Sequence, residues 1–225
     1  MPRQLILDLP VRPALGRGDF LVAPSNAAAL AAIDSDWPMG KLVLIGPRAS
    51  GKSHLARVWA GEHGAVLLEG GTLASQSLAR IEPGAVVVDD ADTVAGDPAA
   101  EQALFHLHNL VMAAGGKLLL TGQEAPARWC VALPDLASRL CATATTRLEP
   151  PDDPLLSAVL VKLFADRQLT VPLSLIPYLV ARMDRSFAAA GALVAALDAQ
   201  ALAEGRAVTR ALAAQVLDSA SQTRP

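Results

Sequence analysis

One eight-residue stretch restricts the fold of this chain more than any other. Residues 46–53 read Gly-Pro-Arg-Ala-Ser-Gly-Lys-Ser, which is the G-x-x-x-x-G-K-[ST] spacing of a phosphate-binding loop. The apolar run Leu42–Ile45 precedes the stretch, and the helix-like segment His54–Ala60 follows it. A glycine-rich turn between a strand and a helix points backbone N–H groups and the positive end of the helix at phosphate oxygens. The sequence therefore predicts a nucleotide site in an α/β fold.

Two side chains of this loop have a chemistry of their own. Lys52 can reach the β- and γ-phosphates of a nucleotide, and the hydroxyl of Ser53 is a ligand for Mg²⁺. We expect the ligand to be ADP or ATP together with Mg²⁺. The predicted nucleotide-binding residues are Gly46, Pro47, Arg48, Ala49, Ser50, Gly51, Lys52, Ser53, His54, Leu21 and Val22.

Apolar runs alternate with helical patterns through the first 150 residues. The runs expected to be strands are 41–45, 65–69, 85–90, 117–121 and 142–148, and a short helix is expected near 73–81. Strands that alternate with helices form a parallel sheet, with the ligand at the carboxyl ends of the strands. The predicted fold class is α/β, with a five-stranded parallel sheet between helices and a small all-α domain after it.

The run Glu149–Pro154, with three prolines, is the clearest linker in the chain. Beyond it the apolar spacing is helical, and we expect helices at 154–166, 174–184, 186–204 and 209–220, with caps at Ser174, Ser186 and Thr209. The first residues are rich in Pro, Gly and Arg, which is typical of an extended arm. The predicted units are the arm (1–19), a nucleotide-binding domain (20–150) and a helical domain (151–225).

Two adjacent carboxylates, Asp89 and Asp90, end the third predicted strand. Asp89 is the expected Mg²⁺ partner of Ser53, and Asp90 is placed to orient or activate the attacking water. Asp92 is expected to be a solvated turn or helix-cap residue. The next strand ends in Thr121-Gly122-Gln123, whose polar groups either contact the γ-phosphate or end the strand without a chemical role.

Arg139 lies in the segment Leu133–Leu140, which is expected to be a short helix near the edge of the domain. A guanidinium in this place can reach a nucleotide bound to a neighbouring subunit, as an arginine finger does. A surface ion pair is the alternative interpretation.

Composition excludes several classes of protein. The net charge of −3 argues against strong direct nucleic-acid binding, and aromatic residues make up 4% of the chain. No apolar run reaches the length of about 18 residues that a membrane span needs. Cys130 and Cys141 do not form a disulfide framework or a metal knuckle, and we expect them to be buried, reduced thiols. The chain is expected to be cytoplasmic.

The predicted arm contains the alternating run Gln4-Leu5-Ile6-Leu7-Asp8-Leu9. The pattern is typical of a short edge strand, and it is also typical of a linear peptide that docks into a groove of a partner.

Four segments together resemble a known family. Gly51–Leu55, Val88–Asp92, Thr121-Gly122 and Leu133–Leu140 are similar to the AAA+ ATPases of the bacterial initiator DnaA type, and within it to the Hda group of regulatory inactivators. The resemblance runs over nearly all 225 residues. Initiators continue into a helix-turn-helix domain, which this chain is expected to lack.

The resemblance implies a function. Gln4, Leu5, Leu7 and Leu9 would bind the sliding clamp, and Arg139 would act in trans to promote hydrolysis of the ATP bound to the initiator DnaA. Re-initiation of replication would thereby be prevented, and homo-oligomers are expected. The alternatives are an autonomous P-loop ATPase, such as a helicase loader, and a nucleotide-gated adaptor that hydrolyses nothing.

The sequence departs from the family at two positions that favour weak intrinsic hydrolysis. AAA+ lids of this type usually place an arginine, called sensor 2, where this chain has Ala188. Arg185 lies one turn earlier and is a weak substitute. Gln123 stands where an acidic residue is usual.

Overall fold

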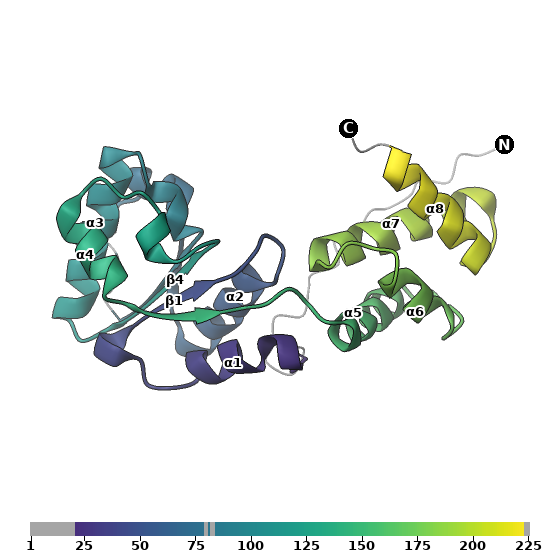
Figure 1. The fold of residues 1–225 in the computed structure, drawn as a ribbon, viewed down its shortest axis with the longest axis horizontal. Coiled ribbons are helices and arrows are strands. Elements are labelled where there is room, and N and C mark those ends of the chain that lie inside the picture. The colour runs from purple at the N-terminus through teal and green to yellow at the C-terminus, as the bar shows by residue number, and fades with distance from the viewer. Residues whose placement is uncertain (1–20, 79–80, 82–83, 223–225) are drawn as a thin grey trace.

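The computed structural model describes residues 21–78, 81 and 84–222. The arm (1–19) with its predicted clamp-binding residues Gln4, Leu5, Leu7 and Leu9 therefore lies outside the described residues. A sheet domain and a helical region lie side by side and are joined by the chain that leads into helix α5 (Figure 1).

The sheet has five parallel strands in the order β2-β3-β4-β1-β5. Their bounds are Lys41–Ile45 for β1, Val66–Glu69 for β2, Ala85–Asp89 for β3, Lys117–Gly122 for β4 and Ala144–Arg147 for β5. Strand β1, which leads into the phosphate-binding loop, is thus next to β4, and β4 separates it from β3. The carboxyl ends of β1, β3 and β4 carry the loop, the Asp89-Asp90 pair and Thr121, respectively. These groups therefore lie at the same edge of the sheet.

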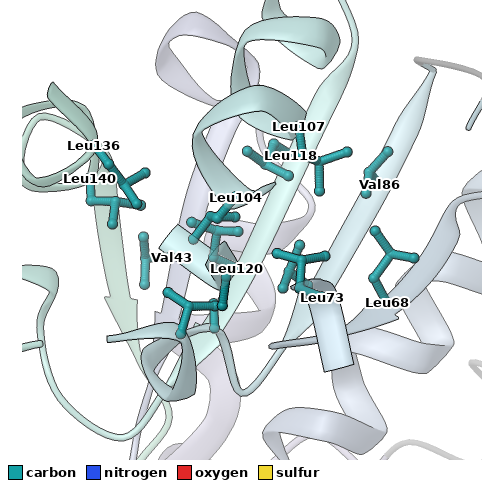
Figure 2. Packing of buried hydrophobic residues seen from close by; sticks show 14 of the residues in the cluster. Val43, Leu68, Leu73, Val86, Leu104, Leu107, Leu118, Leu120, Leu136 and Leu140 are labelled. Carbon is teal, nitrogen blue, oxygen red and sulfur yellow. The ribbon is translucent and has the colours of Figure 1, made fainter. Parts of the chain in front are cut away.

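Side chains of the central strands alternate between two apolar layers. Val43 and Ile45 of β1 pack into one layer, and Leu42 and Leu44 pack into the other. Both layers are covered by helices, so the middle of a central strand is apolar at consecutive positions rather than at every second one. Figure 2 shows the first layer, in which β1 and β4 face the side chains of the covering helices.

Four helices cover the sheet. Their bounds are Pro24–Ile33 for α1, Lys52–His63 for α2, Pro98–Ala113 for α3 and Pro134–Cys141 for α4. The first apolar layer lies under α3 and α4, with Leu104 and Leu136 fully buried, and the second lies under α1 and α2, with Ala29 and Trp59 buried.

The short helix predicted near 73–81 is met by a 3₁₀ helix that lies earlier in the chain, and residues 79 and 80 lie outside the described residues. This 3₁₀ helix is η3, Gly70–Ser75. Gly70 packs so closely that a Cβ there would lie 2.3 Å from the carbonyl oxygen of Asp90. A glycine is therefore required where η3 begins, because any side chain there would collide with the backbone that follows β3.

The helical region consists of α5 (Asp153–Asp166), α6 (Leu175–Val180), α7 (Phe187–Glu204) and α8 (Arg210–Gln222). Ser186 accepts a hydrogen bond from the N–H of Ala189 at 3.1 Å, and Thr209 accepts one from Leu212 at 3.3 Å, so both are caps as predicted. Ser174 makes no capping bond, and α6 ends at Val180 instead of extending to 184.

One described helix, α7, is long and apolar enough by length and composition alone to cross a membrane. Its buried residues recur on one face and pack into the core shared by the four helices: Ala190, Leu193, Val194, Leu197 and Ala201. This spacing is that of a helix with one face toward a protein core.

Both cysteines are exposed, which corrects the expectation of buried thiols. Cys130 lies in a tight turn with φ of 56°, and Cys141 is the last residue of α4. Neither position belongs to an apolar layer.

Candidate functional site

The phosphate-binding loop owes its shape to its two glycines. A Cβ at Gly46 would lie 2.4 Å from the carbonyl oxygen of Leu148, and Gly51 has a φ of 101°. A Cβ at Gly51 would also meet the ring of Phe187, at the start of α7, at 2.8 Å. The second glycine therefore allows both the turn into α2 and the close approach of the helical region.

Lys52, the first residue of α2, is buried within the loop. Its Nζ donates to the carbonyl oxygens of Gly46 at 2.8 Å and Pro47 at 2.9 Å. Burial lowers the pKa of Lys52, and the carboxylates of Asp90, Asp92 and Asp89 act in the opposite direction. The ammonium is therefore fixed at the floor of the loop, facing three acidic groups.

Asp89 is 2% exposed and is held on both of its oxygens. The Thr121 hydroxyl donates to one oxygen at 2.6 Å, and a guanidinium nitrogen of Arg57 lies 3.7 Å from the other. The same hydroxyl accepts the N–H of Asp90 at 2.8 Å. Thr121 thus has a defined contact, which joins the carboxyl ends of β3 and β4.

Asp90 is exposed and lines the cavity described below, with a left-handed backbone (φ 48°). Partial desolvation raises the pKa of Asp90, and the neighbouring charges of Asp89 and Asp92 raise it further. A carboxylate whose pKa is raised in this way is a better proton acceptor, as the predicted role in activating water requires.

Asp92, which the sequence predicted to be a turn or cap residue, lies at the same edge of the sheet as Asp89 and Asp90. It is half-buried in the 3₁₀ turn η5 (Ala91–Val94), and its Oδ2 accepts the N–H of Gln123 at 2.8 Å. Its Oδ1 is buried and has no hydrogen-bond partner among the described residues. The spacing accounts for this position, since a 3₁₀ turn after Asp89 brings a residue three positions later back to the same edge of the sheet.

A cavity of about 870 Å³ lies between the loop and the helical region. Most of its polar lining comes from the sheet domain, and α5 and α7 contribute mainly apolar side chains together with Lys162 and Asp166. The lining residues are Leu21, Asn26, Arg48, Ala49, Gly51, Lys52, Ser53, His54, Asp90, Thr93, Gln123, Leu155, Val159, Lys162, Leu163, Asp166, Phe187 and Ala188. This volume is in the range of cofactor sites.

The cavity contains most of the predicted nucleotide-binding residues. Gly46 and Ser50 are buried in the turn beneath it, and Pro47 lines a smaller neighbouring hollow of about 370 Å³. Val22 is 73% exposed and does not line the cavity, although its neighbour Leu21 does.

Among the described residues of the helical region, no arginine lines the cavity. Ala188 lines it, and Arg185 instead pairs with the carboxylate of Asp153 and donates to the carbonyl oxygen of Pro151. The cation that α5 contributes to the wall is Lys162, which the sequence analysis missed. The spacing of Leu155, Val159, Lys162 and Asp166 places these side chains along one face of a helix.

Arg139 lies away from the loop. Its side chain is exposed, its guanidinium lies 5.1 Å from the ring centroid of Phe105, and it is not among the residues that line the cavity. Helix α4 and the helical region flank opposite sides of the sheet domain (Figure 1). The structure therefore does not bring Arg139 together with the other predicted catalytic residue, Asp90.

The described residues contain no group of three or more His, Cys, Asp or Glu side chains that could hold a metal by themselves. The donors that the sequence assigns to Mg²⁺ are the Ser53 hydroxyl, on a residue that lines the cavity, and the Asp89 carboxylate, which is buried at the end of β3. Such a set fits a hard cation like Mg²⁺, which takes its remaining ligands from phosphate and water.

No protein-family model matches the chain. Among solved structures, domain III of the replication initiation protein DnaA from Thermotoga maritima is 18% identical, with a TM-score of 0.77 over 94% of this chain and 98% of that one. A DNA replication initiation factor is 14% identical, with a TM-score of 0.74 over 84% of this chain and 65% of that one. DnaA from Aquifex aeolicus with bound AMPPCP is 14% identical, with a TM-score of 0.67 over 81% and 64% of the two chains.

The chain thus covers about two thirds of the latter two proteins and nearly all of the domain III structure. The likeness shows the fold, which is the AAA+ fold of DnaA domain III, and the predicted fold class is confirmed.

Proposed function

We propose that this protein is a DnaA-related AAA+ regulator that promotes hydrolysis of the ATP bound to the replication initiator and so prevents re-initiation. Two facts support the proposal: the fold is that of the initiator's domain III, and Arg139 lies outside the chain's own cavity. The proposal includes a cytoplasmic location and homo-oligomers, as the sequence resemblance implies.

In this proposal the cavity binds ADP or ATP. The amides of the loop and Lys52 bind the phosphates, and the apolar side chains of Leu21, Leu155 and Phe187 surround the base. Ser53 and Asp89 hold Mg²⁺, which neutralises phosphate charge when it is bound. Asp90, which lines the cavity and has a raised pKa, is the proton acceptor.

The position of Arg139 is the observation that carries the proposal. An exposed guanidinium away from its own nucleotide site can act on the site of another molecule. Arginine fingers supplied in trans raise hydrolysis by about 10³–10⁵-fold. Ala188 in the cavity also supports the proposal, because no arginine from the described part of the helical region lines the place where a γ-phosphate would bind. The chain's own nucleotide then acts mainly as a conformational signal.

We also propose that the arm recruits the protein to the sliding clamp. The support is the run Gln4–Leu9, in which Leu5, Leu7 and Leu9 are apolar anchors and Gln4 is a polar contact. Recruitment to a clamp on DNA would need no strong nucleic-acid surface of the protein's own, in agreement with the net charge of −3.

An autonomous ATPase is the second candidate. The arrangement of Lys52, Asp89, Asp90 and Thr121 favours it, because these groups meet at one edge of the sheet with the buried carboxylate already held. A nucleotide-gated adaptor without any effect on hydrolysis is the third.

The test mixes the protein with ATP-loaded initiator and clamp loaded on DNA and follows conversion of the initiator to its ADP form. We expect acceleration that Arg139→Ala removes. Arg182→Ala is a matched control, since Arg182 is also exposed and lies over an aromatic ring, that of Tyr178, at 4.1 Å. Turnover by the protein alone that disappears in Lys52→Ala would support the autonomous ATPase instead. Binding without any acceleration would support the adaptor.

A clamp pull-down tests recruitment separately. We expect Gln4→Ala/Leu5→Ala to lose clamp binding while it retains nucleotide binding. Equal capture of this variant and the unmodified chain would show that the arm is not the clamp-binding segment.

A further inference from the structure

Helix α4, which carries Arg139, is only eight residues long. A helix of this length is marginal on its own, so its position depends on what holds its ends. Each end of α4 meets a buried charged side chain from another element: Glu101 of α3 at the amino end and Lys41 of β1 at the carboxyl end.

Glu101 is 2% exposed, and its carboxylate is bound entirely by backbone groups. It accepts N–H groups of Ala132 at 3.0 Å and of Leu133, the residue that caps α4, at 2.8 Å. It also accepts the N–H of Gly96 at 3.1 Å, just after the turn that contains Asp92. One carboxylate thus ties the start of α4 to the segment that leaves the cavity edge of the sheet.

Lys41 is 4% exposed, and its Nζ donates to the carbonyl oxygen of Arg139 at 3.2 Å. The hydroxyl of Thr143 donates to the same oxygen at 2.9 Å. The other neighbour of the ammonium is the ring of His108, at 3.4 Å, and no carboxylate pairs with Lys41 among the described residues.

The two charges match the helix dipole, because the anion lies at the amino end and the cation at the carboxyl end. Burial of the Lys41 ammonium costs free energy, since an ammonium without a carboxylate partner loses hydration that one hydrogen bond to a carbonyl does not replace. An apolar side chain of similar volume would be buried at this position with a smaller free-energy cost. A reason other than stability is therefore needed for a lysine at position 41.

We infer that Glu101 and Lys41 are positioning residues that hold α4 in the orientation in which Arg139 is presented to another molecule. The inference rests on the proposed function. A catalytic guanidinium that is misplaced by about 1 Å costs on the order of 10²-fold in rate. Two buried charged side chains, one at each end of this short helix, limit such movement. Glu101 also couples α4 to the carboxyl edge of the sheet.

Glu101→Gln, Lys41→Met and Thr143→Val test the inference in the initiator assay described above. We expect each of the first two to lower the maximal stimulated rate by about tenfold or more, with affinity for the initiator unchanged. Lys41→Met should not lower the melting temperature, because it removes an unpaired buried charge. Loss of stimulation at unchanged stability is a result that a merely structural lysine would not give. Thr143→Val, which is nearly isosteric, should have a smaller effect in the same direction.

Amide hydrogen exchange of the isolated protein supplies a readout that is independent of the initiator. The amides of α4 should exchange faster in Glu101→Gln and Lys41→Met, and those of α7 should not change. Asp152→Asn is the control, because it weakens a comparable tie, to the N–H groups of Leu155 and Ser25, away from α4.

The outcomes separate the two proposals. If the unmodified protein fails to stimulate the initiator, the proposed function is wrong, and the exchange data still test the support of α4. If the unmodified protein stimulates and Lys41→Met matches it in rate and in α4 exchange, the positioning role is wrong. The lysine and threonine variants keep this test valid even if Glu101→Gln does not fold.

Discussion

The carboxylate of Glu101 is the clearest case in this protein of one residue whose charge is stabilised by the backbone. Burial by itself raises the pKa of Glu101, but hydrogen bonds from Ala132, Gly96 and Leu133 outweigh burial and hold the pKa below its ordinary value of 4.5. Because the folded protein favours the ionised form, this carboxylate contributes stability above pH 4.5. The contribution is lost as the pH falls through the lowered pKa.

We therefore expect the melting temperature to fall in acid, below about pH 4.5, more steeply for the unmodified protein than for Glu101→Gln. The glutamine variant should be less stable at neutral pH, because it has one acceptor oxygen where the carboxylate has two. Thermal melts of both proteins across this pH range measure the effect. Parallel curves would contradict the role given to the carboxylate.

Thr121 makes the second residue-scale prediction. Thr121→Val keeps the volume but leaves the Asp89 oxygen and the Asp90 N–H without their partner. Loss of a partner from buried polar groups costs about 1–3 kcal/mol, so the free energy of unfolding should fall by that amount. Denaturant unfolding measures it, and Thr121→Ser, which keeps the hydroxyl, is the control. A valine variant as stable as the serine variant would contradict the prediction.

At the scale of elements, two serines that looked alike in the sequence behave differently. Ser186 caps α7 through its hydroxyl, and Ser174 does not cap α6. Ser186→Ala should therefore cost about 1 kcal/mol, and Ser174→Ala should be close to neutral. Denaturant unfolding of the two variants compares them directly, and equal effects would contradict the capping assignment.

The strands and most helices followed from local patterns, because a strand buried on both faces is a continuous apolar run and a helix has an apolar face. The bounds of the 3₁₀ helix at Gly70–Ser75 did not follow, since Gly70 at its start packs against the Asp90 carbonyl, a contact between segments 20 residues apart. The prediction of buried cysteines was wrong for the same kind of reason, because the surrounding fold sets the position of Cys130, whose φ is 56°.

At the scale of the whole molecule, the cavity is formed by two parts of the chain that are far apart in sequence. Ala188 reaches it only because α7 begins against the loop, where the N–H of Phe187 donates to the Ala49 carbonyl at 3.3 Å. An arginine at 188 should therefore face a bound γ-phosphate.

We expect Ala188→Arg to bind ATP about tenfold more tightly and to leave ADP affinity little changed, because a hydrogen bond to a charged group is worth about 1.5–3 kcal/mol. Titration with both nucleotides checks this. Ala196→Arg is the matched control, since Ala196 is on an exposed face of the same helix. Equal gains for ATP and ADP would contradict a γ-phosphate contact.

The sequence by itself determined the loop, the order of strands and helices along the chain, and the acidic end of β3, because each depends on local spacing. Tertiary structure decided what these parts do together. It placed Lys162 at the cavity and turned Arg185 away toward Asp153. It also set buried charges at both ends of α4, far from the loop. Contacts between distant segments fix these positions, and no local pattern encodes them.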